Sequence, residues 1–255
     1  MARIRIALQL FSIRKECAKD LRKALEAVAE MGYEGVEFAG FYGYPAGEIR
    51  DMLKDFGLEV VGAHIPLESL MGEKFEETVN YNKELGNRYL IVPWIPEDMR
   101  NSKEAWLKTA RLFNEFSERL KPYGMRVGYH NHMEEFKTFN GETGWDIFFK
   151  NTSKDVIMQL DVGNALRGGV TWEELVGIIR RFPGRLVTIH LKEYSPEKED
   201  VVIGEGIVRW KELIDLCQEV GGTEWYIIEQ GSRRYTPLEC VRICLENLKR
   251  ILGLS

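Results

Sequence analysis

The stretch Val156-Ile157-Met158-Gln159-Leu160-Asp161 indicates the fold, because a short and mainly apolar run ends here in a carboxylate. Such runs are typical of strands in a parallel sheet whose faces are covered by helices. Similar runs recur along the chain, and longer segments with a helical period separate them. We predict eight strands, over Ile4–Phe11, Gly35–Phe38, Glu59–His64, Tyr89–Pro93, Arg126–His130, Val156–Asp161, Leu186–Leu191 and Trp225–Glu229.

The segments between these strands carry the signals of amphipathic helices. The first has one apolar face, formed by Leu21, Leu25, Val28 and Ala29. Thr171 precedes two glutamates as a helix N-cap, and four glycines follow helical segments where a left-handed C-cap is expected, at Gly32, Gly57, Gly86 and Gly124. Strands and helices therefore alternate along the whole chain.

Eight βα units within 255 residues predict an α/β protein with a single (β/α)₈ TIM barrel, one domain over residues 1–255. The alternative is a doubly wound open sheet. Such a sheet often binds a dinucleotide through a GxGxxG turn after its first strand. The chain has Leu10-Phe11-Ser12-Ile13-Arg14 at that position, so the barrel is favoured.

Composition excludes several classes of protein. Hydrophobic residues make up 44% of the chain and charged residues 29%, which excludes a disordered or low-complexity protein. A net charge of −5 disfavours nucleic acid as a partner. The apolar runs are far shorter than the roughly 18 residues that a membrane helix needs, and the first residues show no secretion signal. We expect a soluble, cytoplasmic protein in which Cys240 and Cys244 are small buried residues.

Titratable residues stand at the ends of the predicted strands. They are Glu37, His64, His130, Asp161, His190 and Glu229, and His132 follows His130 by two residues. The chain has only four histidines, and all four lie at predicted strand ends. In a barrel the carboxyl ends of the strands and the loops after them build the active site.

Four of these residues come from four consecutive strands, so their side chains should converge at the barrel mouth: His130, Asp161, His190 and Glu229. Two imidazoles and two carboxylates suit one divalent metal ion, such as Mn²⁺, Zn²⁺, Co²⁺ or Fe²⁺. The alternative is a set of buried polar residues that bridge the strands by hydrogen bonds. The convergence of four ligand types favours the metal site.

The ordered motifs resemble those of the xylose-isomerase-like barrel superfamily of sugar isomerases, sugar-phosphate epimerases, inosose dehydratases and apurinic endonucleases. The resemblance covers the whole chain. It is carried by Gly62-Ala63-His64, Tyr129-His130-Asn131-His132, Leu160-Asp161-Val162-Gly163-Asn164, His190-Leu191-Lys192-Glu193, Gly204-Glu205-Gly206 and Glu229-Gln230.

The resemblance implies a divalent metal held by Glu, Asp, His and Glu on strands five to eight. Asp161, His190 and Glu229 match these positions, whereas His130 stands where the family has a glutamate. In the epimerases of this family the two glutamates also form the acid–base pair. Here Glu229 is the expected base, and His130 can still bind metal and move protons. His132 is an alternative ligand, and the second base is left open among His132, Glu135 and Glu193.

The expected activity is that of a metal-dependent sugar isomerase or epimerase. It would abstract a proton next to the carbonyl of a small keto- or aldo-sugar, through a metal-stabilised enediolate. The alternatives are dehydration of an inosose or keto-sugar, and sugar binding without turnover. The apurinic endonucleases need five histidines, and Asn164 stands at one of their histidine positions, so that activity is disfavoured. The sequence leaves a homo-oligomer open.

Further residues are expected to contact the substrate. Glu37 and His64 are expected to bind its hydroxyl groups, and Trp94 to stack on the sugar ring or pack between helix and barrel. Lys192 is expected to orient a carboxylate or phosphate, or to lie exposed. Glu205 is expected to close a loop over the site, or to be a solvated turn residue.

Overall fold

Eight parallel strands close into one barrel in the computed structural model, which describes residues 3–254. The neighbouring strands are hydrogen-bonded in the order β1-β10-β9-β8-β5-β4-β3-β2, and the ring then closes on β1. The closed ring confirms the barrel and excludes the open sheet. The strands are β1 (Ile6–Gln9), β2 (Gly35–Ala39), β3 (Glu59–His64), β4 (Tyr89–Val92), β5 (Arg126–His130), β8 (Ile157–Asp161), β9 (Thr188–Leu191) and β10 (Trp225–Ile228).

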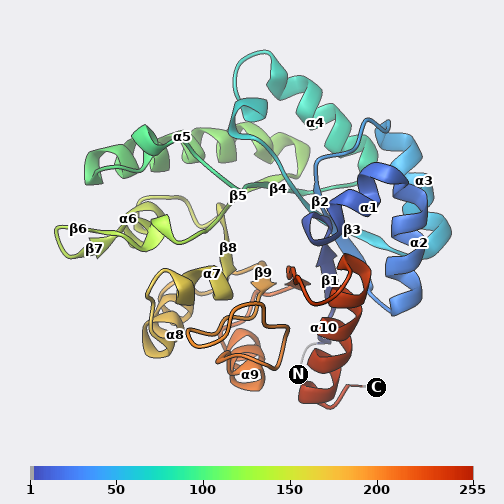
Figure 1. Ribbon diagram of the computed structural model, residues 1–255. Coiled ribbons are helices and arrows are strands. Elements are labelled where there is room, and N and C mark those ends of the chain that lie inside the picture. The colour runs from blue at the N-terminus through green and yellow to red at the C-terminus, as the bar shows by residue number, and fades with distance from the viewer. Residues whose placement is uncertain (1–2, 255) are drawn as a thin grey trace.

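Helices surround the barrel (Figure 1). They are α1 (Arg14–Lys19), α2 (Leu21–Met31), α3 (Ala46–Phe56), α4 (Lys74–Leu85), α5 (Lys103–Leu120), α6 (Gly144–Lys150), α7 (Val162–Arg167), α8 (Trp172–Arg181), α9 (Trp210–Val220) and α10 (Pro237–Leu252). The predicted caps are present. Gly32, Gly57 and Gly86 end α2, α3 and α4 in the left-handed conformation, and Thr171 forms a capping box with Glu174 at the start of α8.

The first strand is shorter than predicted, and its end has a local cause. The strand stops at Gln9 because the Gln9 side chain accepts a hydrogen bond from the Phe11 backbone N–H at 3.1 Å, which caps a 3₁₀ helix over Leu10–Ile13. The strand predicted over Tyr89–Pro93 ends at Val92, before a proline that has no N–H for the ladder. The other strand bounds lie within two residues of the prediction.

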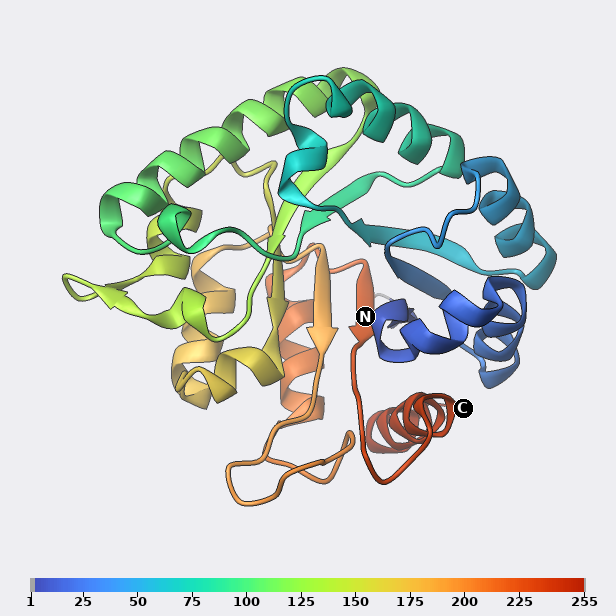
Figure 2. The ribbon, with the colours of Figure 1, turned by 45° about the horizontal axis from the view of Figure 1, so that its top comes forward.

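Two segments extend from the barrel on the mouth side (Figure 2), and the first of them was not predicted. After β5 the chain forms a small antiparallel hairpin of β6 (Thr138–Phe139) and β7 (Glu142–Thr143). Asn140 and Gly141 turn it with φ of 53° and 84°, and an Asn-Gly pair is the sequence signal for such a turn. The second segment is the long loop between β9 and α9, drawn in orange in Figure 2.

The inside of the barrel has two layers of opposite polarity. One layer is apolar and lies nearer the amino ends of the strands: Ala7, Val61, Tyr89, Ile91, Ile157, Val187, Trp225 and Ile227. Side chains alternate between the inside and the outside of a strand, so the next inward position lies two residues further along. The second layer is polar and lies nearer the mouth: Gln9, Glu37, His64, His130, Gln159 and His190. The candidate site therefore rests on an apolar floor.

No helix within residues 3–254 is both long and apolar enough to cross a membrane. All four cysteines are buried and free, as predicted for Cys240 and Cys244.

Candidate metal centre

The ends of β5, β8, β9 and β10 bring four potential metal ligands together. One ligand atom from each of His130, Asp161, His190 and Glu229 can be chosen so that all four lie within 4.8 Å of one another. Parallel pairing causes this convergence, because Asp161 stands opposite His190 in the ladder between β8 and β9. A second set, formed by His64, His130 and His190, also satisfies this distance.

Two of these ligand atoms are buried without a hydrogen-bond partner among the described residues. They are Nδ1 of His130 and Oδ2 of Asp161. Burial and the neighbouring His190 and His64 hold the pKa of His130 well below its usual value, so the ring is neutral and keeps a lone pair. Burial raises the pKa of Asp161, and the neighbouring Glu229 adds to the rise, although Lys192 and His190 oppose it. A cation between these atoms would satisfy both, which is the pattern expected of a metal site.

His190 lies between two carboxylates. Its Nε2 is 2.6 Å from Oε2 of Glu37, and its Nδ1 is 3.0 Å from Oε2 of Glu229. Burial opposes the charged ring, but the two glutamates outweigh it and raise the pKa of His190 to about 10. A fully buried carboxylate at Nε2 fixes the proton on that nitrogen, so Nδ1 is the atom that can face an ion.

Glu37 forms the base of this arrangement. Its side chain is fully buried, and its Oε1 accepts a hydrogen bond from the Gln159 amide at 2.6 Å. Its Oε2 accepts from Gln9 at 2.7 Å as well as from His190, and the Nε2 of His64 lies 3.3 Å away. Burial alone would raise the pKa of Glu37, but His64 and His190 hold it far below its usual value. Glu37 was expected to bind substrate hydroxyl groups; the structure places it beneath His190, with both oxygens occupied.

His64 lies beside the four candidate ligands and belongs to the second set only. Its Nε2 lies 2.8 Å from Oε1 of Gln159, and its ring stacks on His190 with the ring centroids 5.4 Å apart. Its side chain is partly exposed, and it lines a cavity of about 430 Å³ at the ends of β2 and β3. This placement leaves part of the ring open to a molecule at the mouth.

Lys192 follows β9 and reaches two of the candidate ligands. Its Nζ donates to Oε1 of Glu229 at 2.7 Å and lies 3.7 Å from Oδ2 of Asp161. Burial opposes the ammonium, but these two carboxylates outweigh it and raise the pKa of Lys192 above its usual value. In turn, burial would raise the pKa of Glu229, whereas Lys192 and His190 hold it well below its usual value.

Several site residues were missed because they are amides, which sequence reasoning about titratable groups ignores. Asn131 ties β5 to β8: its Oδ1 accepts from the Asp161 N–H at 2.8 Å, and its amide donates to the Asp161 carbonyl at 3.1 Å. The Asn164 N–H donates to Oδ1 of Asp161 at 2.7 Å, which fixes that carboxylate. Gln9 and Gln159 occupy inward positions, and a polar residue at an inward position is a signal that could have found them.

The candidates for a second base differ in their surroundings. Glu135 is buried and accepts from the Tyr129 hydroxyl at 2.8 Å and the His132 N–H at 2.6 Å. Glu193 is buried and accepts four N–H groups of the β9–α9 loop, those of Tyr194, Gly204, Val208 and the Trp210 indole. Both glutamates hold loops in place. The half-buried ring of His132 lies against His130, with centroids 5.2 Å apart.

Two predicted substrate contacts lie outside the cluster. Trp94 is 55% exposed, and the guanidinium of Arg100 lies 5.9 Å from its ring centroid. Glu205 lies in the β9–α9 loop, where its carboxylate accepts from the Val202 N–H and pairs with Arg234. The structure therefore does not bring these two side chains to the four candidate ligands.

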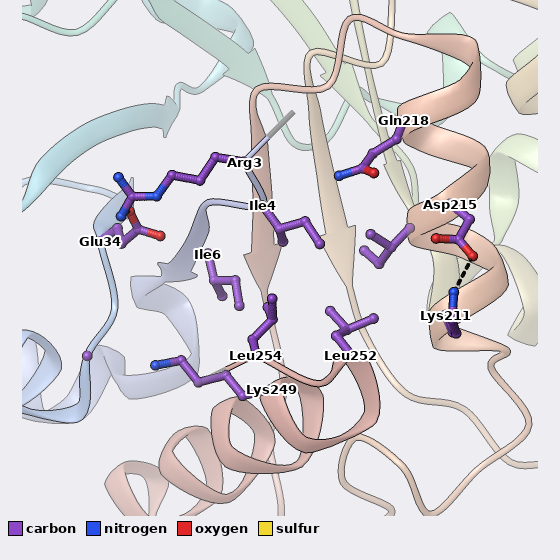
Figure 3. A pocket seen from close by; sticks show the side chains of 12 residues that line it. Arg3, Ile4, Ile6, Glu34, Lys211, Asp215, Gln218, Lys249, Leu252 and Leu254 are labelled. Carbon is purple, nitrogen blue, oxygen red and sulfur yellow. Dashed lines mark hydrogen bonds and ion pairs between the residues drawn. The ribbon is translucent and has the colours of Figure 1, made fainter. Parts of the chain in front are cut away.

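Another cavity, of about 610 Å³, lies away from the mouth, between α9, the end of α10 and the start of β1 (Figure 3). Its apolar lining includes Ile4 and Leu252. Its described acidic residues are already paired: Glu34 with Arg3 and Asp215 with Lys211. The converging titratable groups at the mouth make that end the better candidate site.

Comparisons with known proteins agree with this geometry. The curated relatives include an inosose dehydratase of Erwinia tasmaniensis, 22% identical over 84% of this chain and 85% of that protein. A sugar phosphate isomerase/epimerase of Parabacteroides distasonis has the same fold, with a TM-score of 0.82 at 22% identity over 99% of this chain and 95% of that one. A structure of IOLI protein with a bound zinc atom has a TM-score of 0.76 at 15% identity over 98% of both chains. The family model of the xylose isomerase-like TIM barrel matches residues 25–251, and the chain belongs to this family.

Proposed function

We propose that the chain is a metal-dependent enzyme that isomerises or epimerises a small keto- or aldo-sugar, or a derivative of one. One observation carries the proposal: four potential ligand atoms converge within 4.8 Å at the barrel mouth, and two of these buried atoms have no hydrogen-bond partner among the described residues. The family of the chain and the name of the Parabacteroides protein support the substrate class.

The donor set fits one divalent ion. His130, Asp161, His190 and Glu229 would hold it, and a mixed set of imidazole and carboxylate suits Zn²⁺, Mn²⁺, Co²⁺ or Fe²⁺. The zinc atom in the structure of IOLI protein supports an ion in this family. When bound, such an ion polarises the substrate carbonyl and stabilises the negative charge that proton removal leaves.

Glu229 is the proposed base. Its carboxylate is 13% exposed, so a substrate can reach it, and Lys192 donates to its Oε1 at 2.7 Å, which restrains the side chain. A base must lie within hydrogen-bond reach of the proton it removes, and a fixed carboxylate meets that need better than a mobile one. His132 is the proposed partner that returns the proton, because Glu135 and Glu193 are held by their loops. Lys192 is proposed to stabilise oxygen anions at the same point.

A dehydratase is the second candidate, and the curated relatives named inosose dehydratase favour it. The first step is the same removal of a proton by Glu229. Dehydration then needs an acid to protonate the leaving hydroxyl group, and the partly exposed His132 is the candidate for that role. The two reactions differ only in the fate of the carbanion equivalent, so one set of residues serves both.

The test starts with the metal. Purified protein is treated with chelator, reloaded with Mn²⁺ or Zn²⁺, and analysed for bound metal per chain. Keto-sugars and inosose are then incubated in D₂O with the loaded protein, and deuterium next to the carbonyl is followed by NMR. Exchange with recovery of a sugar isomer supports the isomerase, and an enone product with ultraviolet absorbance supports the dehydratase. Metal binding without exchange on any of these sugars would favour a binding protein and contradict the proposed activity.

A further inference from the structure

A cavity of about 580 Å³ adjoins the candidate metal centre, and apart from Lys192 its lining residues have no role in the mechanism proposed above. It lies between the end of β8, the loop after β9 and the end of β10. Gly163 and Gln230 line it, and they follow Asp161 and Glu229 by two residues and one residue. The cavity is therefore within reach of a substrate that touches those two carboxylates.

Lys192 connects the cavity with the metal centre. It lines the cavity, and its ammonium contacts Glu229 at 2.7 Å. The side chain is held close to Gly163: a Cβ at that glycine would lie 2.7 Å from the Lys192 carbonyl oxygen and 2.9 Å from its Cβ and Cγ. The small residue at position 163 thus permits the approach of the lysine stem. The Lys192 side chain is 26% exposed, and its ammonium has three N–H donors, of which Glu229 takes one, so donors remain for an anion.

Arg167, the last residue of α7, also lines the cavity and forms no ion pair with a carboxylate among residues 3–254. Lys198 in the β9–α9 loop is a further cation of the lining, and its charge helps to lower the pKa of Glu205. The guanidinium of Arg167 lies 6.0 Å from the ring centroid of Tyr194 and close enough to Lys192 to disfavour its charge. The positive charges of Arg167 and Lys192 repel each other, and an anion bound between them would offset this repulsion.

Three of the four acidic residues of the lining are held by other groups. The carboxylate of Glu193 is buried and accepts four N–H groups, so it does not face the cavity as a free charge. Asp200 accepts the backbone N–H groups of Arg233 and Arg234 at 2.7 and 3.1 Å. Glu199 lies 3.9 Å from Arg233, and Glu197 is exposed. Of the cations in the lining, Lys192 contacts the candidate metal centre, and Arg167 lies near enough to Lys192 to act on its charge.

We propose that this cavity binds an anionic group of the substrate, a carboxylate or a phosphate, with Arg167 and Lys192 as its two cationic contacts. Arginine suits this role because its planar fork of N–H donors matches either anion. The identity of the substrate as a sugar derivative rests on the proposed function, whereas the anion site depends only on these residues. The substrate class is then a sugar acid or a sugar phosphate rather than a neutral sugar.

Calorimetric titration of the chelator-treated full chain tests the site without any metal. Inorganic phosphate and acetate are the two probes, and the variants are Arg167→Gln and the control Arg22→Gln, which changes an exposed arginine paired with Asp55. We expect saturable binding of at least one probe by the wild type and by Arg22→Gln, weakened about ten-fold or more in Arg167→Gln. Binding should also weaken as salt is added.

The outcomes distinguish a sugar phosphate from a sugar acid, and they test the anion site separately from the proposed enzymatic function. Preference for phosphate supports a sugar phosphate, and preference for acetate supports a sugar acid. Absence of saturable binding by either probe, or equal binding by Arg167→Gln and the wild type, overturns the anion site. Because the titration uses metal-free protein, a chain that binds phosphate through Arg167 but takes up no metal would contradict the proposed function alone.

Discussion

The two layers inside the barrel share one backbone geometry and differ in chemistry. On two strands an inward apolar residue is followed, two positions later, by an inward polar one: Ala7 and Gln9, Ile157 and Gln159. Glu229 follows Ile227 by the same spacing, just after β10. The apolar layer removes hydrocarbon from water, which stabilises the fold. The polar layer must satisfy every buried donor and acceptor, because an unpaired one costs about 1–3 kcal/mol.

The difference shows that different residues inside the barrel contribute to folding stability and to the candidate metal centre. The apolar layer excludes water from one side of the candidate metal centre, and a poorly solvated surrounding strengthens the electrostatic interactions there. Substitutions in the two layers should therefore affect different measurements. Changes near the mouth should alter metal binding, and changes in the apolar layer should alter the free energy of unfolding.

The largest expected effect is the loss of metal binding in His190→Ala. The wild type should retain about one divalent ion per chain after reloading, and the variant none, because alanine removes the ligand that both glutamates orient. Metal per chain is measured by elemental analysis after gel filtration. Retention of a full equivalent by the variant would show that the ion binds elsewhere.

Ile157→Ala should give the next largest effect, on stability. Its fully buried side chain lies in the apolar layer, and its removal leaves a cavity, so the free energy of unfolding should fall by about 2–5 kcal/mol. Urea unfolding of the metal-free protein measures it. Metal per chain at low temperature should stay near that of the wild type. A variant of normal stability that binds no metal would break the distinction between the layers.

Glu37→Gln should weaken metal binding without abolishing it. The amide keeps the size of the side chain but no longer holds the proton on Nε2 of His190 as strongly, and loss of such a partner costs about 10–100-fold in metal affinity. Competition with a chromogenic chelator measures the affinity. Glu34→Gln, which changes a glutamate paired with Arg3 outside the barrel, is the matched control and should bind metal like the wild type.

The smallest effect is expected for Ile227→Val. Loss of one methylene group from the apolar layer should lower the free energy of unfolding by about 0.5–1.5 kcal/mol. Glu229 lies only two residues further along the chain, so this variant tests how sharply the layers are separated. The metal affinity, measured as for Glu37→Gln, should be unchanged. A ten-fold loss would mean that the apolar layer positions the ligand.

Much of the fold could be predicted because the strands and helices carry local signals. The apolar runs, the glycine C-caps and the capping box at Thr171 each depend on a few neighbouring residues. The end of β1 was misplaced because the Gln9 side chain competes with the ladder for the backbone. The hairpin at Asn140 was missed although its turn residues are typical, because its strands have only two residues each.

The sequence by itself determined the alternation of eight βα units and the order of titratable residues at the strand ends. Both are repeated local patterns, and parallel strands place all their carboxyl ends on one face. Only the tertiary structure decided which of those residues meet. It set Glu37 beneath His190, joined Asn131 to Asp161 and directed Lys192 between two carboxylates. These contacts join residues far apart in the chain, and they depend on the stagger of the closed barrel, which no short stretch of sequence encodes.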